Sequence, residues 1–188
     1  MIEHRYAEVN GVKLHYATAG TGKLMLFVHG FPQFWYAWSE LLPEFARDHQ
    51  AVAPDMRGVN LSAKPEGVKA YHVTQQTNDL RALMRHLGHE RCILVGHDWG
   101  GACAWHFASQ HPEEIEKLVI INAPHPVMFA RELRNNERQR KASDYMALFR
   151  LDKAERVLAE DGFRRLTYFF REWGSAGGAR PDAATLAT

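Results

Sequence analysis

Hydrophobic and polar positions in the first two thirds of the chain alternate between two kinds of pattern. Short runs that are apolar throughout, or apolar at every second position, predict strands. These runs are residues 5–9, 12–17, 24–28, 50–53, 92–95 and 118–121. Apolar residues spaced three and four apart predict amphipathic helices over residues 38–45 and 80–87, and a longer helical pattern follows residue 98. Strands that alternate with helices in this way predict a mostly parallel α/β sheet.

The two ends of the sequence depart from this alternation. Asn10-Gly11, which separates the first two predicted strands, is the pair that two-residue hairpin turns favour, so we expect antiparallel strands at one edge of the sheet. From Val127 onward the pattern is helical only, and the small, polar tail from Arg180 to Thr188 predicts a loop. We therefore expect two parts: residues 1–126, with a sheet truncated after about six strands, and residues 127–188, the incomplete beginning of a helical lid.

Composition narrows the functional classes. Lys and Arg number 23 and Asp and Glu 22, so no bulk field favours nucleic acid or a membrane surface. The longest apolar runs are too short to span a membrane, and the charged start at Glu3 does not fit a secretory signal. Cys92 lies in a predicted strand and Cys103 in the following helix, which favours buried, reduced thiols and a cytoplasmic protein. Neither belongs to a C-x-x-C pair, so we expect no metal, and we expect no cofactor.

The segment Gly96-His97-Asp98-Trp99-Gly100 joins a predicted buried strand to a predicted helix. The pattern G-x-D-x-G in this place is typical of a nucleophile elbow with Asp98 as the nucleophile. The turn needs glycine on both sides because it is too tight for side chains. The helix amino terminus beside Asp98 favours an ionised carboxylate. The alternative is that Asp98 only caps the helix.

A second motif, His29-Gly30-Phe31-Pro32, follows the apolar strand of residues 24–28. A glycine at this position lets the backbone turn so that the N–H of Phe31 points above the elbow. The N–H groups of Phe31 and Trp99 can then converge on one oxygen and form an oxyanion hole. His29 is expected to be structural and to tie loops together.

These two motifs, together with Pro54-Asp55-Met56-Arg57-Gly58, resemble the α/β-hydrolase fold in order and spacing. The resemblance extends to about Arg150. It points to the branch with an aspartate nucleophile, which contains epoxide hydrolases, haloalkane dehalogenases and fluoroacetate dehalogenases. Within this branch, fluoroacetate dehalogenases carry arginines where this chain has Trp99 and Ala102. Haloalkane dehalogenases carry Glu or Asn where it has Phe31.

The residues around Phe31 are more similar to those of epoxide hydrolases. The resemblance implies a substrate pocket that includes Pro32, Trp35 and Trp38. It also matches Tyr145 to a lid tyrosine that binds the epoxide and protonates its oxygen, a task that suits a phenol. The alternative for Tyr145 is an ordinary lid residue with its hydroxyl at the rim.

The implied reaction has two steps. Asp98 attacks an epoxide carbon of a small apolar substrate, and water activated by a histidine then hydrolyses the ester. After Asp98 the chain has His106, His111 and His125, and none is at the base position of the family. We therefore expect an amino-terminal portion of an epoxide-hydrolase-like protein that is inactive or reacts once. A haloalkane dehalogenase and a non-catalytic small-ligand binder remain alternatives. The oligomeric state is not indicated.

Overall fold

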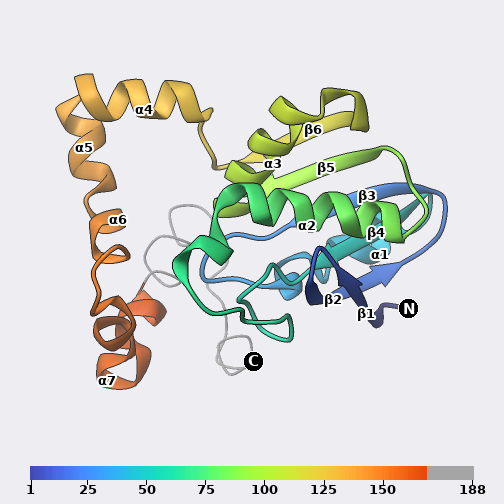
Figure 1. The fold of residues 1–188 in the computed structure, drawn as a ribbon, viewed down its shortest axis with the longest axis horizontal. Coiled ribbons are helices and arrows are strands. Elements are labelled where there is room, and N and C mark those ends of the chain that lie inside the picture. Colours follow the sequence, from blue (N-terminus) through green and yellow to red (C-terminus); the bar gives the residue numbers. More distant parts are fainter. Residues whose placement is uncertain (169–188) are drawn as a thin grey trace. The chain divides into compact units, whose positions relative to one another are not determined.

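Six strands form one sheet in the computed structural model, which describes residues 1–168 (Figure 1). Their order in the sheet is β1-β2-β4-β3-β5-β6. β1 pairs with β2, and β2 with β4, in antiparallel fashion, whereas β4, β3, β5 and β6 are parallel. The strands are β1 (Glu3–Val9), β2 (Val12–Ala19), β3 (Lys23–Val28), β4 (His49–Pro54), β5 (Cys92–His97) and β6 (Ile115–Ile121). The mostly parallel α/β sheet predicted from the sequence is thus confirmed.

The hairpin at the edge of the sheet has the predicted turn. Asn10 and Gly11 both have positive φ, 49° and 74°, as a two-residue turn that matches the strand twist requires. The register pairs Val9 with Val12. The hairpin places His15 in β2, and the side chain of His15 is completely buried.

Helices connect the parallel strands. Those of the sheet region are η1 (Trp35–Trp38), α1 (Leu41–Phe45), η2 (Val68–Tyr71), α2 (Val73–His86), α3 (Trp99–Gln110) and η3 (Pro112–Glu114). The prediction of one helix over residues 38–45 is wrong, because the structure divides this segment into η1 and α1. A continuous helix would need the N–H of Pro43 to bond the carbonyl of Ser39, and proline has no N–H. In the first turn of a short helix that begins at Leu41, the same proline is tolerated.

The core lies on both faces of the sheet, as parallel strands require. Alternate residues of β3 separate the two faces: Leu24 and Leu26 face the cluster that contains residues of α2 and α3, and Met25 and Phe27 face the cluster with Trp38 and Leu42. In Figure 1, α2 and α3 lie on one side of the strands and α1 on the other. The carboxyl ends of β3 and β5 are therefore held rigidly from both sides, and the candidate site begins there.

The chain divides into two compact units, Met1–Phe129 and Ala130–Thr188, close to the boundary expected at residue 126. The helices from residue 126 to the end of the described part are α4 (Pro126–Asn135), α5 (Glu137–Ser143), α6 (Tyr145–Leu148) and α7 (Ala154–Tyr168). The loop expected from Arg180 lies outside the described residues. None of the described helices combines the length and the apolar character that a membrane span needs.

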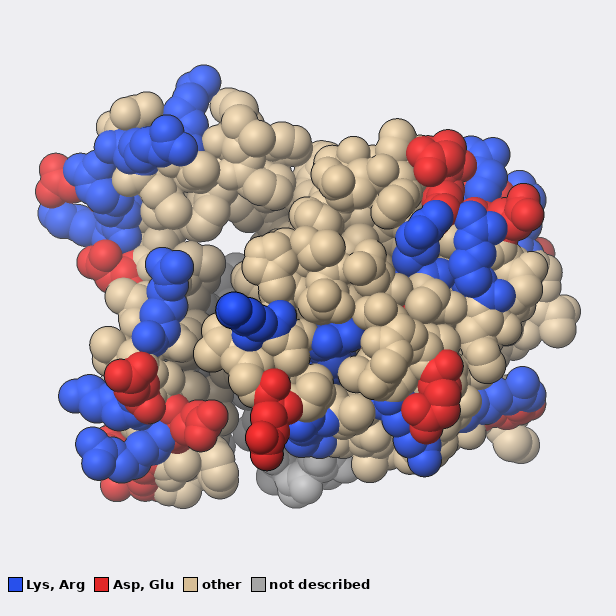
Figure 2. All heavy atoms as spheres, viewed as in Figure 1, with Lys and Arg blue, Asp and Glu red and all other residues tan. Residues whose placement is uncertain are grey.

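A few acidic side chains are interspersed among the basic ones along α4 and α5, where Figure 2 shows some red among blue. Arg131 lies 3.6 Å from Glu132, and Lys141 forms an ion pair with Glu137 at 2.9 Å. These ion pairs are typical of a solvated helix surface.

Candidate active site

Asp98 lies at a sharp turn between β5 and α3. Its backbone has φ 52° and ψ −117°, a region that non-glycine residues avoid. Its N–H donates to the carbonyl of Ile121 in β6, at 3.1 Å, which holds the turn against the neighbouring strand. Such strain persists only where the surroundings fix it, and it gathers at functional sites. The strand, turn and helix predicted as a nucleophile elbow are present.

Glycines leave almost no free space around this turn. A Cβ on Gly30 would lie 2.4 Å from Cβ of Asp98, and one on Gly96 would lie 2.6 Å from the carbonyl oxygen of Gly100. Gly100 and Gly101 are equally restricted, by Val28 O at 2.3 Å and Ala123 Cβ at 2.4 Å. Larger residues would push the elbow away from β3. The glycines are therefore required by close approach of the backbone rather than by their own φ angles.

The carboxylate of Asp98 is bound from the other motif. The N–H of Phe31 donates to Asp98 Oδ1 at 2.9 Å. Although Asp98 occupies the N-cap position of α3, its side chain makes no capping hydrogen bond. The Trp99 N–H is the first of α3 and by position has no partner within the helix. The Phe31 amide thus contacts Asp98, and the Trp99 amide follows it in the sequence. The oxyanion hole that these two amides would form stays a prediction.

The loop that carries Phe31 is held on both sides by the segment after β4. Before the loop, the ring of His29 donates from Nδ1 to the Gly30 carbonyl at 2.9 Å and accepts from the N–H of Met56 at 3.0 Å. After the loop, the N–H of Trp35 donates to Asp55 Oδ1 at 2.9 Å. Burial lowers the pKa of His29, so the ring is neutral, as these two bonds require. His29 has the structural position that was expected for it.

The three expected pocket residues differ in their surroundings. Pro32 and Trp35 are half-buried near the loop. Trp38 is only 5% exposed and packs on Phe27, with 5.3 Å between ring centroids. Trp38 thus belongs to the core cluster of that face of the sheet, and its place in a substrate pocket stays a prediction.

Tyr145 begins α6 in the second unit, where its ring contacts Phe149 edge-on at 5.8 Å. It is half-buried. Its role as an acid stays a prediction.

The three histidines after Asp98 have other partners. His106 Nδ1 lies 3.0 Å from Thr77 Oγ1, and the exposed His125 packs edge-on against Trp105. His111 has Glu113 at 3.9 Å, beyond hydrogen-bonding distance. In the described part of the chain, none of the three is hydrogen-bonded to a carboxylate, as a catalytic base would be.

A buried histidine–aspartate pair does exist elsewhere, and the sequence analysis missed it. His15 Nδ1 lies 2.7 Å from Asp55 Oδ2, and both side chains are fully buried. The other ring nitrogen of His15 lies 3.0 Å from Nδ1 of His4. Because both nitrogens are occupied and no water can reach them, this pair anchors loops and cannot activate a water molecule.

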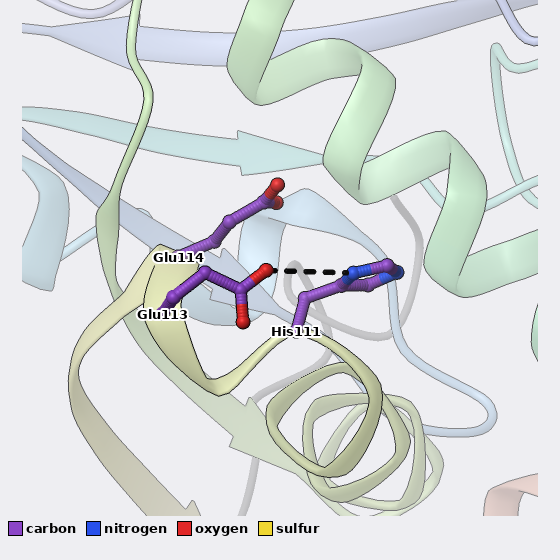
Figure 3. A group of neighbouring side chains, drawn as sticks. All are labelled: His111, Glu113 and Glu114. Atoms are coloured by element: carbon purple, nitrogen blue, oxygen red, sulfur yellow. Dashed lines mark ion pairs between the residues drawn. The ribbon is translucent and has the colours of Figure 1, made fainter.

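His111, Glu113 and Glu114 form the one group with possible metal-ligand spacing that the described residues contain. Figure 3 shows the three side chains gathered together, with the ion pair between Glu113 and His111 marked. Glu114 accepts hydrogen bonds from Arg81 and Arg85, the shortest at 2.7 Å and 2.8 Å. Two guanidinium groups at one carboxylate disfavour a cation there, so we interpret the group as an ion-pair cluster.

A strained strand–turn–helix elbow that presents a carboxylate, with the amide of a neighbouring loop bound to it, defines an α/β-hydrolase core. The family model for the alpha/beta hydrolase fold matches residues 23–172, and the chain belongs to this family.

The chain is also similar to individual proteins of this family. The chain is 40% identical to epoxide hydrolase 1 of Caenorhabditis elegans, over 90% of its own length and 43% of that protein. It is 40% identical to the AB hydrolase superfamily protein YfhM of Bacillus subtilis, over 88% of its own length and 59% of that protein. It thus spans about half the length of these relatives. An inhibitor complex of Bacillus megaterium epoxide hydrolase superposes with a TM-score of 0.87 at 44% identity, covering 90% of this chain and 60% of that one.

Proposed function

We propose that this chain carries the nucleophilic half of an epoxide hydrolase and that Asp98 forms an ester with the substrate. The observation that supports it most is the bond from the Phe31 N–H to Asp98 Oδ1, because it divides the roles of the two carboxylate oxygens. Oδ1 is held by an amide, which leaves Oδ2 to attack. The similarity to several epoxide hydrolases at about 40% identity supports the choice of substrate.

The first step forms a bond between Oδ2 and an epoxide carbon while the carbon–oxygen bond of the ring breaks. The electron pair of that bond goes to the ring oxygen, which takes a proton from an acid. We assign the acid to Tyr145, on the resemblance of its segment to the epoxide-binding lid. The product is an ester of Asp98 whose carbonyl oxygen is Oδ1.

The second step would place water on the carbonyl carbon of this ester. Negative charge then develops on Oδ1, where the amides of Phe31 and Trp99 would stabilise it. The step also needs a histidine oriented by an acid, and His106, His111 and His125 have other surroundings. For this 188-residue chain we therefore propose a reaction that stops at the ester.

A haloalkane dehalogenase is less well supported. A leaving halide needs N–H donors beside the nucleophile, and Phe31 provides no polar side chain there. The indole N–H of Trp99 donates to Oε1 of the buried Gln76 at 3.2 Å. We also propose that the chain works in the cytoplasm, which the two buried free thiols support.

Mass spectrometry after incubation with styrene oxide tests the proposal. A folded sample should gain the mass of one substrate on the peptide that contains Asp98, with no continuing release of diol. Competing reaction at Cys92 or Cys103 is not expected, since burial raises the pKa of both thiols to about 12. The matched control is Asp98→Asn, which keeps the shape and removes the nucleophilic charge.

Two results would contradict the proposal. An equal adduct on the Asp98→Asn variant would show that another group reacts. A folded wild-type sample that gains no adduct from styrene oxide, and instead releases chloride from a short chloroalkane, would favour the dehalogenase. Far-UV circular dichroism and a cooperative melting curve establish that the sample is folded.

A further inference from the structure

A second hydrogen bond lies beside the one that holds Asp98. Nδ1 of His97 lies 3.0 Å from Oε1 of Gln33, so the ring donates from Nδ1 to the amide oxygen. The Phe31–Asp98 and Gln33–His97 bonds connect the same two segments, the loop after β3 and the end of β5. We call the two bonds together the double cross-link.

Backbone interactions hold both residues of the second bond in place. The N–H of Gln33 donates to the Gly30 carbonyl at 3.0 Å and closes a turn that contains Phe31. His97 is the last residue of β5 and is paired with Ile121 of β6. A bond between these side chains therefore restrains the position of the Phe31 amide relative to Asp98.

Neither partner of this bond adds a charge beside the carboxylate. Gln33 is neutral. Burial lowers the pKa of His97, and the negative charge of the neighbouring Asp98 raises it by a smaller amount. His29 is another titratable group that interacts electrostatically with His97. His97 is therefore a neutral donor near pH 7.

We propose that Gln33 is a positioning residue for the nucleophile. Through His97 it keeps the Phe31 amide on Asp98 Oδ1, and because its side chain is uncharged it does so without placing an imidazolium beside Asp98. The proposal rests on the proposed function for its catalytic consequence, whereas its structural content depends on the double cross-link alone.

The test compares Gln33→Met with Gln50→Met. Methionine has nearly the length of glutamine and no amide acceptor. Gln50 provides a matched control because its Oε1 lies 2.7 Å from Nε2 of His89, a bond of the same kind at the opposite, amino-terminal end of the parallel strands. In proton–nitrogen NMR spectra, Gln33→Met should shift the Phe31 amide proton upfield and speed its exchange with solvent. Gln50→Met should leave it unchanged.

The rate of Asp98 alkylation by styrene oxide is the second measurement. Gln33→Met should lower it by roughly five- to tenfold, the effect of losing one ordinary hydrogen bond. Equal melting temperatures of Gln33→Met and Gln50→Met would show that the difference between them is local.

Gln33→Glu separates the acceptor from its charge. A carboxylate still accepts from His97, so the Phe31 amide should keep its wild-type position in the spectrum. The added negative charge favours the imidazolium and raises the pKa of His97, which an NMR titration of the ring measures directly. Alkylation by this variant should therefore be slower at pH 6 than at pH 8, and by a larger ratio than in the wild type.

An unchanged Phe31 amide in Gln33→Met, or the same change in Gln50→Met, would overturn the proposal. If the folded wild type forms no adduct at Asp98, the proposed function fails, and the NMR comparison still decides whether Gln33 positions the Phe31 amide.

Discussion

Asp98 combines a strained backbone with a bound carboxylate, and the two effects can be measured separately. At φ 52° and ψ −117° an alanine is as unfavourable as an aspartate, whereas glycine is not. Asp98→Ala and Asp98→Gly both remove the carboxylate and its bond to Phe31. The difference between the two variants therefore reports the strain, reduced by the larger conformational entropy of glycine in the unfolded chain.

We expect Asp98→Gly to be more stable than Asp98→Ala by about 1–3 kcal/mol, the usual cost of such a conformation. Urea unfolding of the two variants checks this. If Asp98→Ala were the more stable, the elbow would have relaxed into an ordinary turn when the carboxylate was removed. A strained residue that lowers stability but serves the reaction is common at reactive centres.

At the residue scale, the sequence was informative where chemistry depends on neighbours in the chain. Gly96, Asp98 and Gly100 could be recognised from their spacing, and Gly30 with Phe31 from their place after a buried strand. The bond between Gln33 and His97 could not, because it joins side chains 64 positions apart and depends on their rotamers. The pair of His15 and Asp55, 40 positions apart, was missed for the same reason.

At the scale of elements, η3 is attached to α2 by one carboxylate. Arg81 and Arg85 are four residues apart on α2, so both can reach Glu114. The hydrogen bond with Arg81, followed by that with Arg85, lowers the pKa of Glu114 from 4.5 to about 2, although burial opposes the shift. The contact is therefore stronger when Glu114 is ionised.

This shift predicts acid sensitivity with a definite sign. The unfolded chain binds a proton at Glu114 near pH 4.5, and the folded chain does so only near pH 2. The stabilisation is therefore complete above about pH 5 and is lost as the pH falls toward 2. Glu114→Gln should be less stable than wild type by about 2 kcal/mol at pH 7, less than for fully buried pairs because both arginines are half-exposed.

Denaturant unfolding of both proteins between pH 7 and pH 3 checks this expectation. The difference in the free energy of unfolding should shrink steadily with falling pH. A difference that stays constant would mean that the two guanidinium groups bind the neutral amide as well as the carboxylate.

Periodicity predicted the elements better than their limits. The apolar spacing of Trp38, Leu41, Leu42 and Phe45 indicated one helix, but Pro43 divides the segment. Period-two alternation identified β1 and β2. It could not give the order of the strands in the sheet, which depends on contacts between segments far apart in the chain.

At the scale of the whole molecule, β6 is an edge strand in the described sheet. Two of its side chains are well exposed for apolar residues, Val119 at 42% and Ile121 at 37%. An apolar edge with free backbone groups is a template for pairing with another chain. We therefore expect the 188-residue protein to self-associate as its concentration rises.

Val119→Lys should reduce this association, because a charge on an edge strand opposes pairing. Leu61→Lys is the control, because Leu61 is 54% exposed and lies in a loop rather than in the edge strand β6. Light scattering over a concentration series measures both variants. If the two substitutions help equally, net charge rather than the strand edge governs association.

The bond from the Phe31 amide to Asp98 has one more consequence. In the resting protein the amide donor is already occupied by an anion, and that anion is covalently part of the chain. Acetate or phosphate from a buffer would find no vacancy there. Asp98→Ala removes this tethered carboxylate beside the first turn of α3, and a formate ion has the shape to replace it. The carboxylate of the nucleophile is thus also a tethered ligand of the Phe31 amide and excludes other anions from it.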